Sequence, residues 1–190
     1  VGHRGGSPMR GKYYHTYGFG NLRDYPLADD KYAIEQLADR YPYIDATRVG
    51  IFGHSGGGFM ATAAICTYPD FYKAAVSAAG NHDNYIYNKW FTETHNGATE
   101  EKKVVKDSVN GDQEEITFET KSKTNQELAK NYKGGLLIVT GDMDKTVNTF
   151  FDFNKYTEVS EVTNFSHVAR TYSIFSFDIF PWIWFQLFDT

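Results

Sequence analysis

The first 147 residues predict an α/β fold, in which helices cover both faces of a parallel sheet. Helix-like and strand-like segments alternate along this region, apolar strand-like runs end in glycine, and a glycine-rich turn joins one run to a helix of small residues. The chain has 190 residues, 41% apolar and 23% charged, which is typical of one globular domain. Its net charge of -5 argues against a protein that binds nucleic acid.

The first predicted helix begins near Asp29 and Asp30, whose negative charges favour a helix N-terminus. Pro42 then ends it. Between these points, apolar residues recur at the three- and four-residue spacing of a buried helix face: Ala33, Ile34, Leu37, Ala38 and Tyr41.

The strand, turn and helix expected at residues 49–67 carry the clearest chemical pattern. Gly53-His54-Ser55-Gly56-Gly57 lies between an apolar run and a small-residue helix, and it matches the G-x-S-x-G nucleophile elbow. In such a turn the serine hydroxyl is lifted off the sheet, and the next backbone N–H can stabilise an oxyanion. We therefore expect Ser55 to be a nucleophile and Gly56 to supply an oxyanion N–H; the alternative is a tight turn with an incidental serine.

Two more apolar runs, 74–79 and 136–140, predict further strands, and two acids follow the second run. A hydrolase with this elbow needs an acid and then a histidine, in that chain order. Asp142 and Asp144 are the candidate acids, although either is otherwise a solvated turn residue. Of the six histidines only His167 follows them, so His167 is the candidate base.

Residues 98–123 predict a solvated hairpin outside the core. Twelve of these 26 residues are Asp, Glu or Lys. An Asn110-Gly111 pair lies between two candidate strands, which is typical of a tight hairpin turn.

Several motifs together resemble the catalytic domain of the prolyl oligopeptidase family, and most closely its dipeptidyl peptidase IV branch. The resemblance runs from Val1 to Val147. It implies a serine peptidase with an α/β-hydrolase domain and a β-propeller, acting on short peptides. No metal or cofactor is expected, because no histidine-carboxylate cluster in the sequence has ligand spacing and an acyl-enzyme mechanism has no role for a metal. The resemblance also implies that Ser55 is the nucleophile and that Asp144, not Asp142, is the acid. The motifs are Arg4-Gly5-Gly6, residues 45–48, residues 53–58, Ala79-Gly80-Asn81-His82-Asp83 and residues 141–147.

The same resemblance suggests a substrate pocket. Counted back from Thr92-Glu93, Tyr87 and Phe91 match two aromatic residues that line the pocket for proline or alanine in this branch. The alternative is that Tyr87, Trp90 and Phe91 form the packed face of a helix.

Departures from the family predict an incomplete α/β-hydrolase fold. Strands that precede Arg4, a loop with an oxyanion tyrosine, and the propeller are not in this sequence. Residues 148–190 contain no glycine but 9 of the 15 phenylalanines, and only 22 residues separate Asp144 from His167. We expect an atypical aromatic tail there, either an out-of-frame or foreign segment, or a divergent tail that packs on the sheet or on another protein.

These observations predict a serine peptidase that hydrolyses short peptides through an acyl-enzyme. Two alternatives stay open: an esterase or other acyl hydrolase of the same fold, and an inactive truncated fragment that self-associates. The single cysteine, Cys66, leaves the cellular compartment undecided.

Overall fold

The structure is a computed structural model that describes residues 5–105, 113–141, 144 and 147. Asp142, His167 and the tail expected at 148–190 therefore lie outside the described residues.

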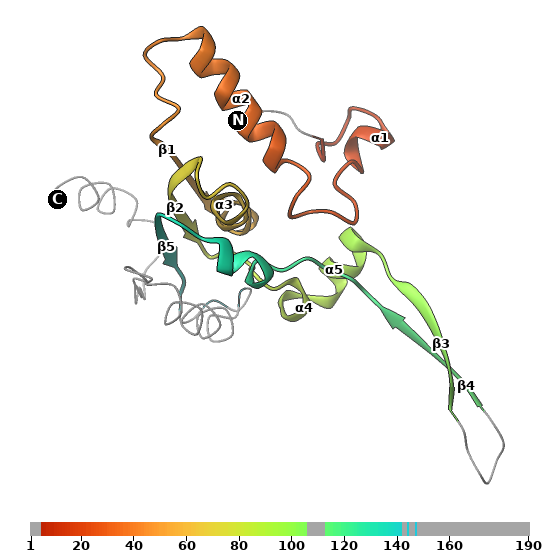
Figure 1. Ribbon diagram of the computed structural model, residues 1–190. Coiled ribbons are helices and arrows are strands. Elements are labelled where there is room, and N and C mark those ends of the chain that lie inside the picture. Colours follow the sequence, from red (N-terminus) through yellow and green to blue (C-terminus); the bar gives the residue numbers. More distant parts are fainter. Residues whose placement is uncertain (1–4, 106–112, 142–143, 145–146, 148–190) are drawn as a thin grey trace.

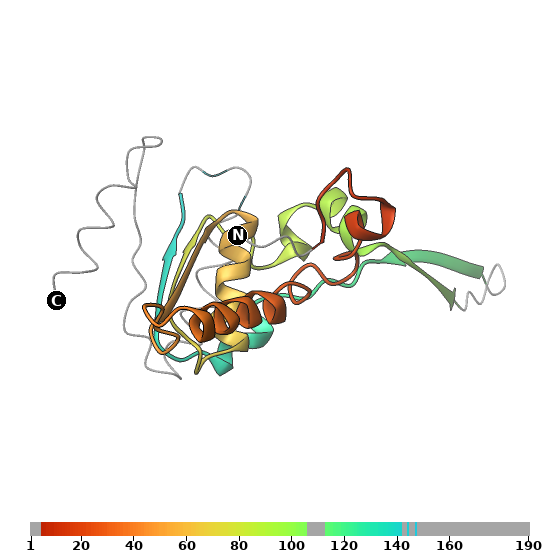
Figure 2. The same cartoon turned by 90° about the horizontal axis from the view of Figure 1, so that it is seen from above.

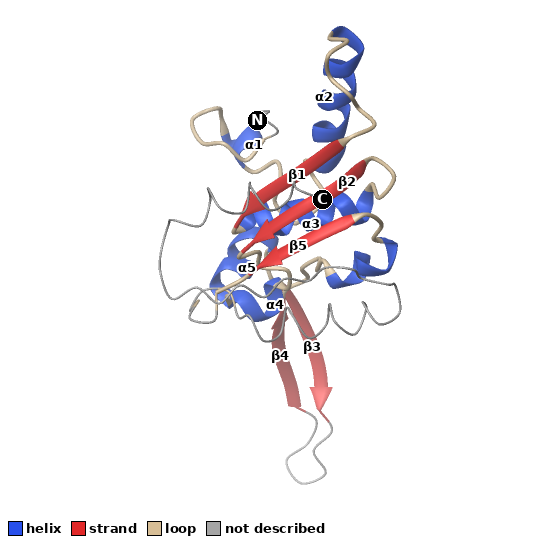
Figure 3. Cartoon of the chain, turned by 90° about the vertical axis from the view of Figure 1, so that its left-hand side faces the viewer, coloured by secondary structure: helices blue, strands red, loops and turns tan. Residues whose placement is uncertain are grey.

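A parallel sheet of three strands forms the centre of the described region. Figure 3 shows the strands side by side and pointing the same way, so their carboxyl ends share one edge. The α/β class predicted from the sequence is confirmed. The strand order is β1 (Val49–His54), β2 (Tyr72–Ala78) and β5 (Gly135–Val139).

Helix α3 (Gly56–Thr67) packs against β1 and β2 (Figure 1). It contributes more residues to the core than any other described element. Its side chains are apolar nearly all round, as expected for a helix that is buried on several sides. The core cluster contains Ala63, Ala64, Ile65 and Cys66 of this helix, together with Leu27, Tyr72, Ala75, Ala129, Leu136 and Ile138.

Helix α2 (Leu27–Arg40) corresponds to the first predicted helix. Asp29 and Asp30 lie in its first turn and Arg40 in its last, which matches the polarity of the helix dipole. The 3-10 helix η1 (Gln126–Asn131) packs on α3, whereas the short helix α1 (Lys12–His15) has no buried residue. Two further short helices, α4 (Asn84–Tyr87) and α5 (Lys89–Asn96), follow β2.

Coverage of the sheet differs from the prediction of helices on both faces. In the described part of the chain α3 covers one face, whereas β1 alternates between half-buried and exposed residues. Phe52, on the exposed face, has 77% of its surface open to solvent.

A two-stranded hairpin projects from the body of the molecule (Figures 1 and 2). Its strands, β3 (Thr99–Val105) and β4 (Gln113–Glu119), pair antiparallel within the segment where a hairpin is expected. The Asn110-Gly111 pair falls between them, outside the described residues. None of the described helices has both the length and the apolar character that crossing a bilayer requires.

Candidate active site

Ser55 occupies a strained turn between β1 and α3. Its φ of 56° and ψ of -122° are unfavourable for a residue with a side chain, at a cost of about 1–3 kcal/mol. The surrounding backbone holds this conformation: the Ser55 N–H donates to the Ala78 carbonyl at 2.8 Å, and the Ser55 carbonyl accepts from the Phe59 N–H at 3.0 Å. Ser55 is exposed. The turn therefore presents a serine hydroxyl to solvent at the carboxyl edge of the sheet.

Two glycines make this turn sterically feasible. A Cβ atom on Gly53 would lie 2.2 Å from the Gly57 carbonyl oxygen, and one on Gly58 would lie 2.7 Å from the Ala78 carbonyl oxygen. Both contacts are with backbone atoms, which cannot rotate away. Strand, turn and helix approach as closely as they do because these positions lack side chains.

Gly56 begins helix α3 directly after Ser55. Backbone N–H groups in a first helical turn have no partner within the helix, and they carry the positive end of its dipole. Gly56 is exposed, and apart from its chain neighbours and the backbone of its own helix turn, no atom lies within 4 Å of where its Cβ would be. An anion that develops next to the Ser55 hydroxyl can therefore approach this N–H.

Asp144 follows β5, on the far side of β2 from Ser55. Its N–H donates to the Gly141 carbonyl at 3.0 Å, and its Oδ1 accepts from the Val147 N–H at 3.1 Å. Val147 is buried. Ser55 and Asp144 thus follow the carboxyl ends of two strands in one sheet, while the candidate base, His167, lies outside the described residues.

Tyr87 and Phe91 contact each other, but they belong to two short helices. α4 (Asn84–Tyr87) and α5 (Lys89–Asn96) are separated by Asn88 in an extended conformation. Asn88 ends one helix and caps the next, since its side chain accepts from the Phe91 N–H at 3.2 Å. The Tyr87 and Phe91 rings meet edge to face with centroids 5.2 Å apart, and both are half-buried. Trp90 is 73% exposed, so the three aromatics do not form one packed helix face.

A buried polar cluster beneath the elbow was missed from the sequence. It consists of Ser77, His82 and Asn125, which have almost no exposed surface. In the sequence, His82 belongs to the motif at residues 79–83, and it precedes the candidate acids, so it does not qualify as the catalytic base. The signal was the polar run that follows the second strand, because polar side chains at this edge of a parallel sheet often face a site.

Cys66 is not a second candidate nucleophile. Cys66 is buried, and desolvation raises the pKa of its thiol to about 12, so it stays protonated. Within the described ranges, no three His, Cys, Asp or Glu side chains are grouped to hold a metal ion.

Comparison with solved structures shows which fold this arrangement belongs to. A dipeptidyl peptidase 4 from Porphyromonas gingivalis superimposes with a TM-score of 0.74 at 22% identity, covering 96% of this chain and 24% of that one. An acylaminoacyl peptidase from Pyrococcus horikoshii gives 0.67 at 19% identity, covering 88% of this chain and 26% of that one. These similarities confirm the expected α/β-hydrolase fold as a partial fold.

Sequence relatives give the family. Dipeptidyl peptidase family member 1 of Caenorhabditis elegans is 35% identical over 94 residues, which are 48% of this chain and 12% of that protein. The chain thus spans a small part of the relatives it matches. The model of the prolyl oligopeptidase family matches residues 1–161, beyond the Val147 where the expected resemblance ends. This match supports the serine-peptidase class expected from the sequence, and the chain belongs to the prolyl oligopeptidase family.

Proposed function

We propose that this chain carries the nucleophile of a serine peptidase that cleaves short peptides, as a dipeptidyl peptidase does. One observation carries the proposal: Ser55 is held at a left-handed φ of 56° between a strand end and a helix start. Strain of this kind persists where the surrounding structure enforces it, and it is concentrated at active sites. The substrate class is taken from the named sequence relative, which is a dipeptidyl peptidase family member.

The reaction proceeds through an acyl-enzyme. Ser55 Oγ attacks the scissile carbonyl carbon while its proton passes to His167, and the resulting oxyanion accepts a hydrogen bond from the Gly56 N–H. The C–N bond then breaks as His167 returns the proton to the leaving amine. Water repeats the sequence on the ester and frees Ser55, while Asp144 holds the imidazole in the productive tautomer and stabilises its cation.

The aromatic pair suits a small apolar residue of the substrate. Tyr87 and Phe91 are fixed by helix caps and by their edge-to-face contact, so a substrate ring packing on them orders few rotamers. Proline and alanine side chains fit such a surface. A β-propeller that limits substrate length is part of the same proposal.

Labelling with a fluorophosphonate probe tests the nucleophile, because such probes react with a serine that its neighbours activate. We expect the wild-type chain to be labelled and Ser55→Ala and His167→Ala to lose labelling. Ser7→Ala is the control, because it removes another serine hydroxyl at a position far from the elbow in the sequence. Labelling that survives in Ser55→Ala would exclude Ser55 as the nucleophile, and survival in His167→Ala would exclude that base. An unlabelled wild-type chain would show that it is not a competent hydrolase.

Substrate class is tested separately. Dipeptide-amide and simple ester chromogenic substrates are compared on the same preparation. Turnover of the ester alone would favour the esterase alternative, because the elbow itself does not distinguish amide from ester.

A second candidate, a catalytically silent fragment that self-associates, is favoured by the exposed side of the sheet. Phe52 offers a large apolar surface on a strand face that no described helix covers. Light scattering tests this candidate. An average particle mass that rises with protein concentration, and rises less in Phe52→Ser, would support it. A monomer that turns over a peptide or ester substrate would overturn it.

A further inference from the structure

We propose that Ser77, His82 and Asn125 form a positioning cluster, which holds the first turn of α3 and thereby sets the geometry of Ser55 and the Gly56 N–H. This inference rests on the proposed function. The three side chains come from β2, from the loop after it and from the residue before η1. They lie under the turn, away from solvent, and none of them is a candidate to touch the substrate.

The cluster holds α3 through two carbonyl groups in its first turn. Ser77 Oγ donates to the Gly58 carbonyl at 2.9 Å. Asn125 Nδ2 donates to the Phe59 carbonyl at 2.8 Å. Gly58 and Phe59 follow Ser55 by three and four residues, so these bonds fix the helix turn whose N-terminal amides face the reacting carbonyl.

His82 connects the two donors, and the hydrogen bonds assign its tautomer. Asn125 Nδ2 lies 2.9 Å from His82 Nδ1, and an amide nitrogen only donates, so Nδ1 is the acceptor. The ring proton is then on Nε2, which lies 3.2 Å from Ser77 Oγ. Ser77 Oγ accepts a hydrogen bond from this N–H and donates its own hydrogen to the Gly58 carbonyl. The chain of hydrogen bonds therefore runs in one direction, from Asn125 through His82 and Ser77 to α3.

Backbone contacts bind the cluster to the elbow and to the aromatic pair. The Asn125 N–H donates to the His82 carbonyl at 3.0 Å. A Cβ on Gly80 would lie 2.8 Å from the His82 ring and 2.9 Å from the Gly58 carbonyl carbon, so ring, loop and helix are in close packing. Asp83, next to His82, caps α4 by accepting from the Tyr85 N–H at 2.9 Å. The turn that carries Ser55 and the helix that ends in Tyr87 are thus fixed to the same loop.

Burying three polar side chains costs free energy that apolar residues of similar volume would not cost. A purely structural cluster would also lose stability without Ser77 Oγ, because its hydrogen-bond partners would be left unsatisfied. Positioning predicts, in addition, a slower reaction of Ser55 at matched folded fraction. Ser77→Ala removes only Oγ. Ala75→Gly is the matched control, because it also removes one heavy atom from a buried residue, on the same strand and face but outside the cluster.

The test has two readouts. Amide hydrogen exchange of Ser55 and Phe59, whose N–H groups donate to the Ala78 and Ser55 carbonyls, is resolved by NMR and compared with that of the other core amides. We expect Ser77→Ala to accelerate exchange at these residues about tenfold more than elsewhere in the core, as the loss of one buried hydrogen bond predicts. Ala75→Gly is expected to change all core amides alike. Equal patterns in the two variants would overturn the proposal.

The second readout is the rate of fluorophosphonate labelling. At matched folded fraction, Ser77→Ala should be labelled about tenfold more slowly than wild type, and Ala75→Gly less than about twofold more slowly. If Ser77→Ala accelerated amide exchange at the elbow but left the labelling rate unchanged, the cluster would be structural only, which also overturns the proposal. If the wild-type chain is not labelled, the proposed function fails, and the exchange data alone decide whether the cluster holds the turn.

Discussion

The elbow and the hairpin are two regions of one chain that are held together in different ways. At the elbow, β1, α3 and β2 approach so closely that there is no room for one additional atom. A Cβ on Gly53, for example, would lie 2.2 Å from the Gly57 carbonyl oxygen. In the hairpin, β3 and β4 pair with each other through seven opposed residue pairs and extend away from the body. Residues at the elbow are fixed by several neighbours each, whereas those in the hairpin depend mainly on the residue opposite.

The difference also appears in where apolar side chains lie. On one face of the hairpin Val104, Ile116 and Phe118 are exposed, opposite or next to charged residues of the partner strand. An isolated two-stranded hairpin is marginally stable in water. We therefore expect substitutions at the elbow to have large global effects and those in the hairpin to have small local ones.

Gly53→Ala is expected to have the largest effect, a loss of more than about 3 kcal/mol in the free energy of unfolding, because its Cβ would overlap the Gly57 carbonyl group. Urea unfolding followed by circular dichroism measures it. Gly57→Ala is the control, since its Cβ position has no atom within 4 Å apart from its chain neighbours and the backbone of its own helix turn. If Gly53→Ala were as stable as Gly57→Ala, the backbone at Gly53 and Gly57 would have to be farther apart than it is in this structure.

Two isoleucines allow the comparison with an identical substitution. Ile65 in α3 is fully buried, and Ile65→Ala should lower the free energy of unfolding by about 3 kcal/mol through lost burial and a residual cavity. Ile116 in β4 is 51% exposed, and Ile116→Ala should cost less than about 0.5 kcal/mol. Equal losses in urea unfolding would mean that the hairpin is part of the core.

Protonation of His82 makes the stability of the elbow region depend on pH. Burial lowers the pKa of His82 from 6.5 to about 4. The unfolded chain therefore takes up a proton as the pH falls below about 6.5 while the folded chain does not, so stability is lost on acidification through this window. Between pH 8 and pH 5 the loss is about 2 kcal/mol.

Unfolding free energies measured across that pH range, for wild type and His82→Gln, check the effect. The variant should lose less stability on acidification, whatever its stability at high pH. His15→Gln, at an exposed position, should keep the wild-type slope. A His82→Gln variant with the wild-type slope would contradict the neutral, buried state of the ring.

Local rules in the sequence predicted the elbow and the three strands well, because glycine placement and apolar runs are visible over a few residues. The His82 cluster was not predicted, since it needs Asn125, which lies 43 positions further along the chain. The break at Asn88 was missed for a different reason. The i, i+3, i+4 spacing of Tyr87, Trp90 and Phe91 fits one helix, and nothing in that period reveals that Asn88 caps a second one.

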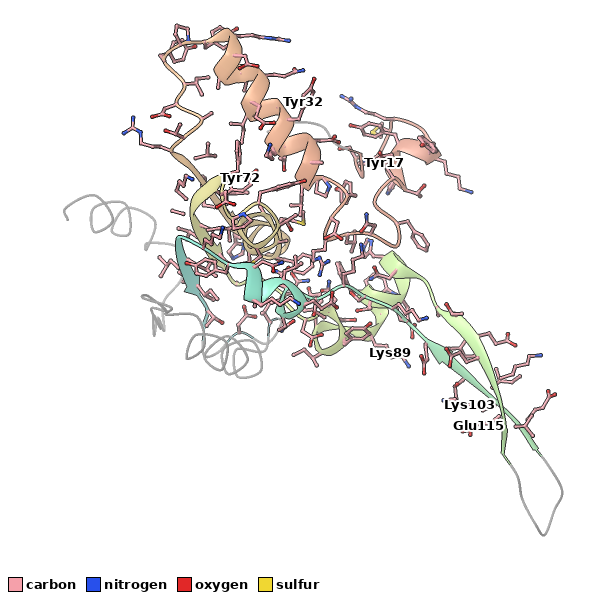
Figure 4. The ribbon with its side chains drawn as sticks, in the orientation of Figure 1. Tyr17, Tyr32, Tyr72, Lys89, Lys103 and Glu115 are labelled. Atoms are coloured by element: carbon pink, nitrogen blue, oxygen red, sulfur yellow. The ribbon has the colours of Figure 1, made fainter. Side chains whose placement is uncertain are left out.

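The smallest expected effect is on the hairpin register. Lys103 faces Glu115 across the strands, towards the outer end of the hairpin (Figure 4). Glu115→Lys would place two lysines opposite each other and should cost at most about 0.5 kcal/mol, less at high salt, where the repulsion is screened. Amide exchange of the hairpin residues at low and high salt resolves so local a change. Glu119→Lys makes the same change in net charge opposite Thr99, so it should leave hairpin protection nearly independent of salt. If both variants responded equally to salt, the opposed pair would not be Lys103 and Glu115, and the register of the hairpin would have to shift.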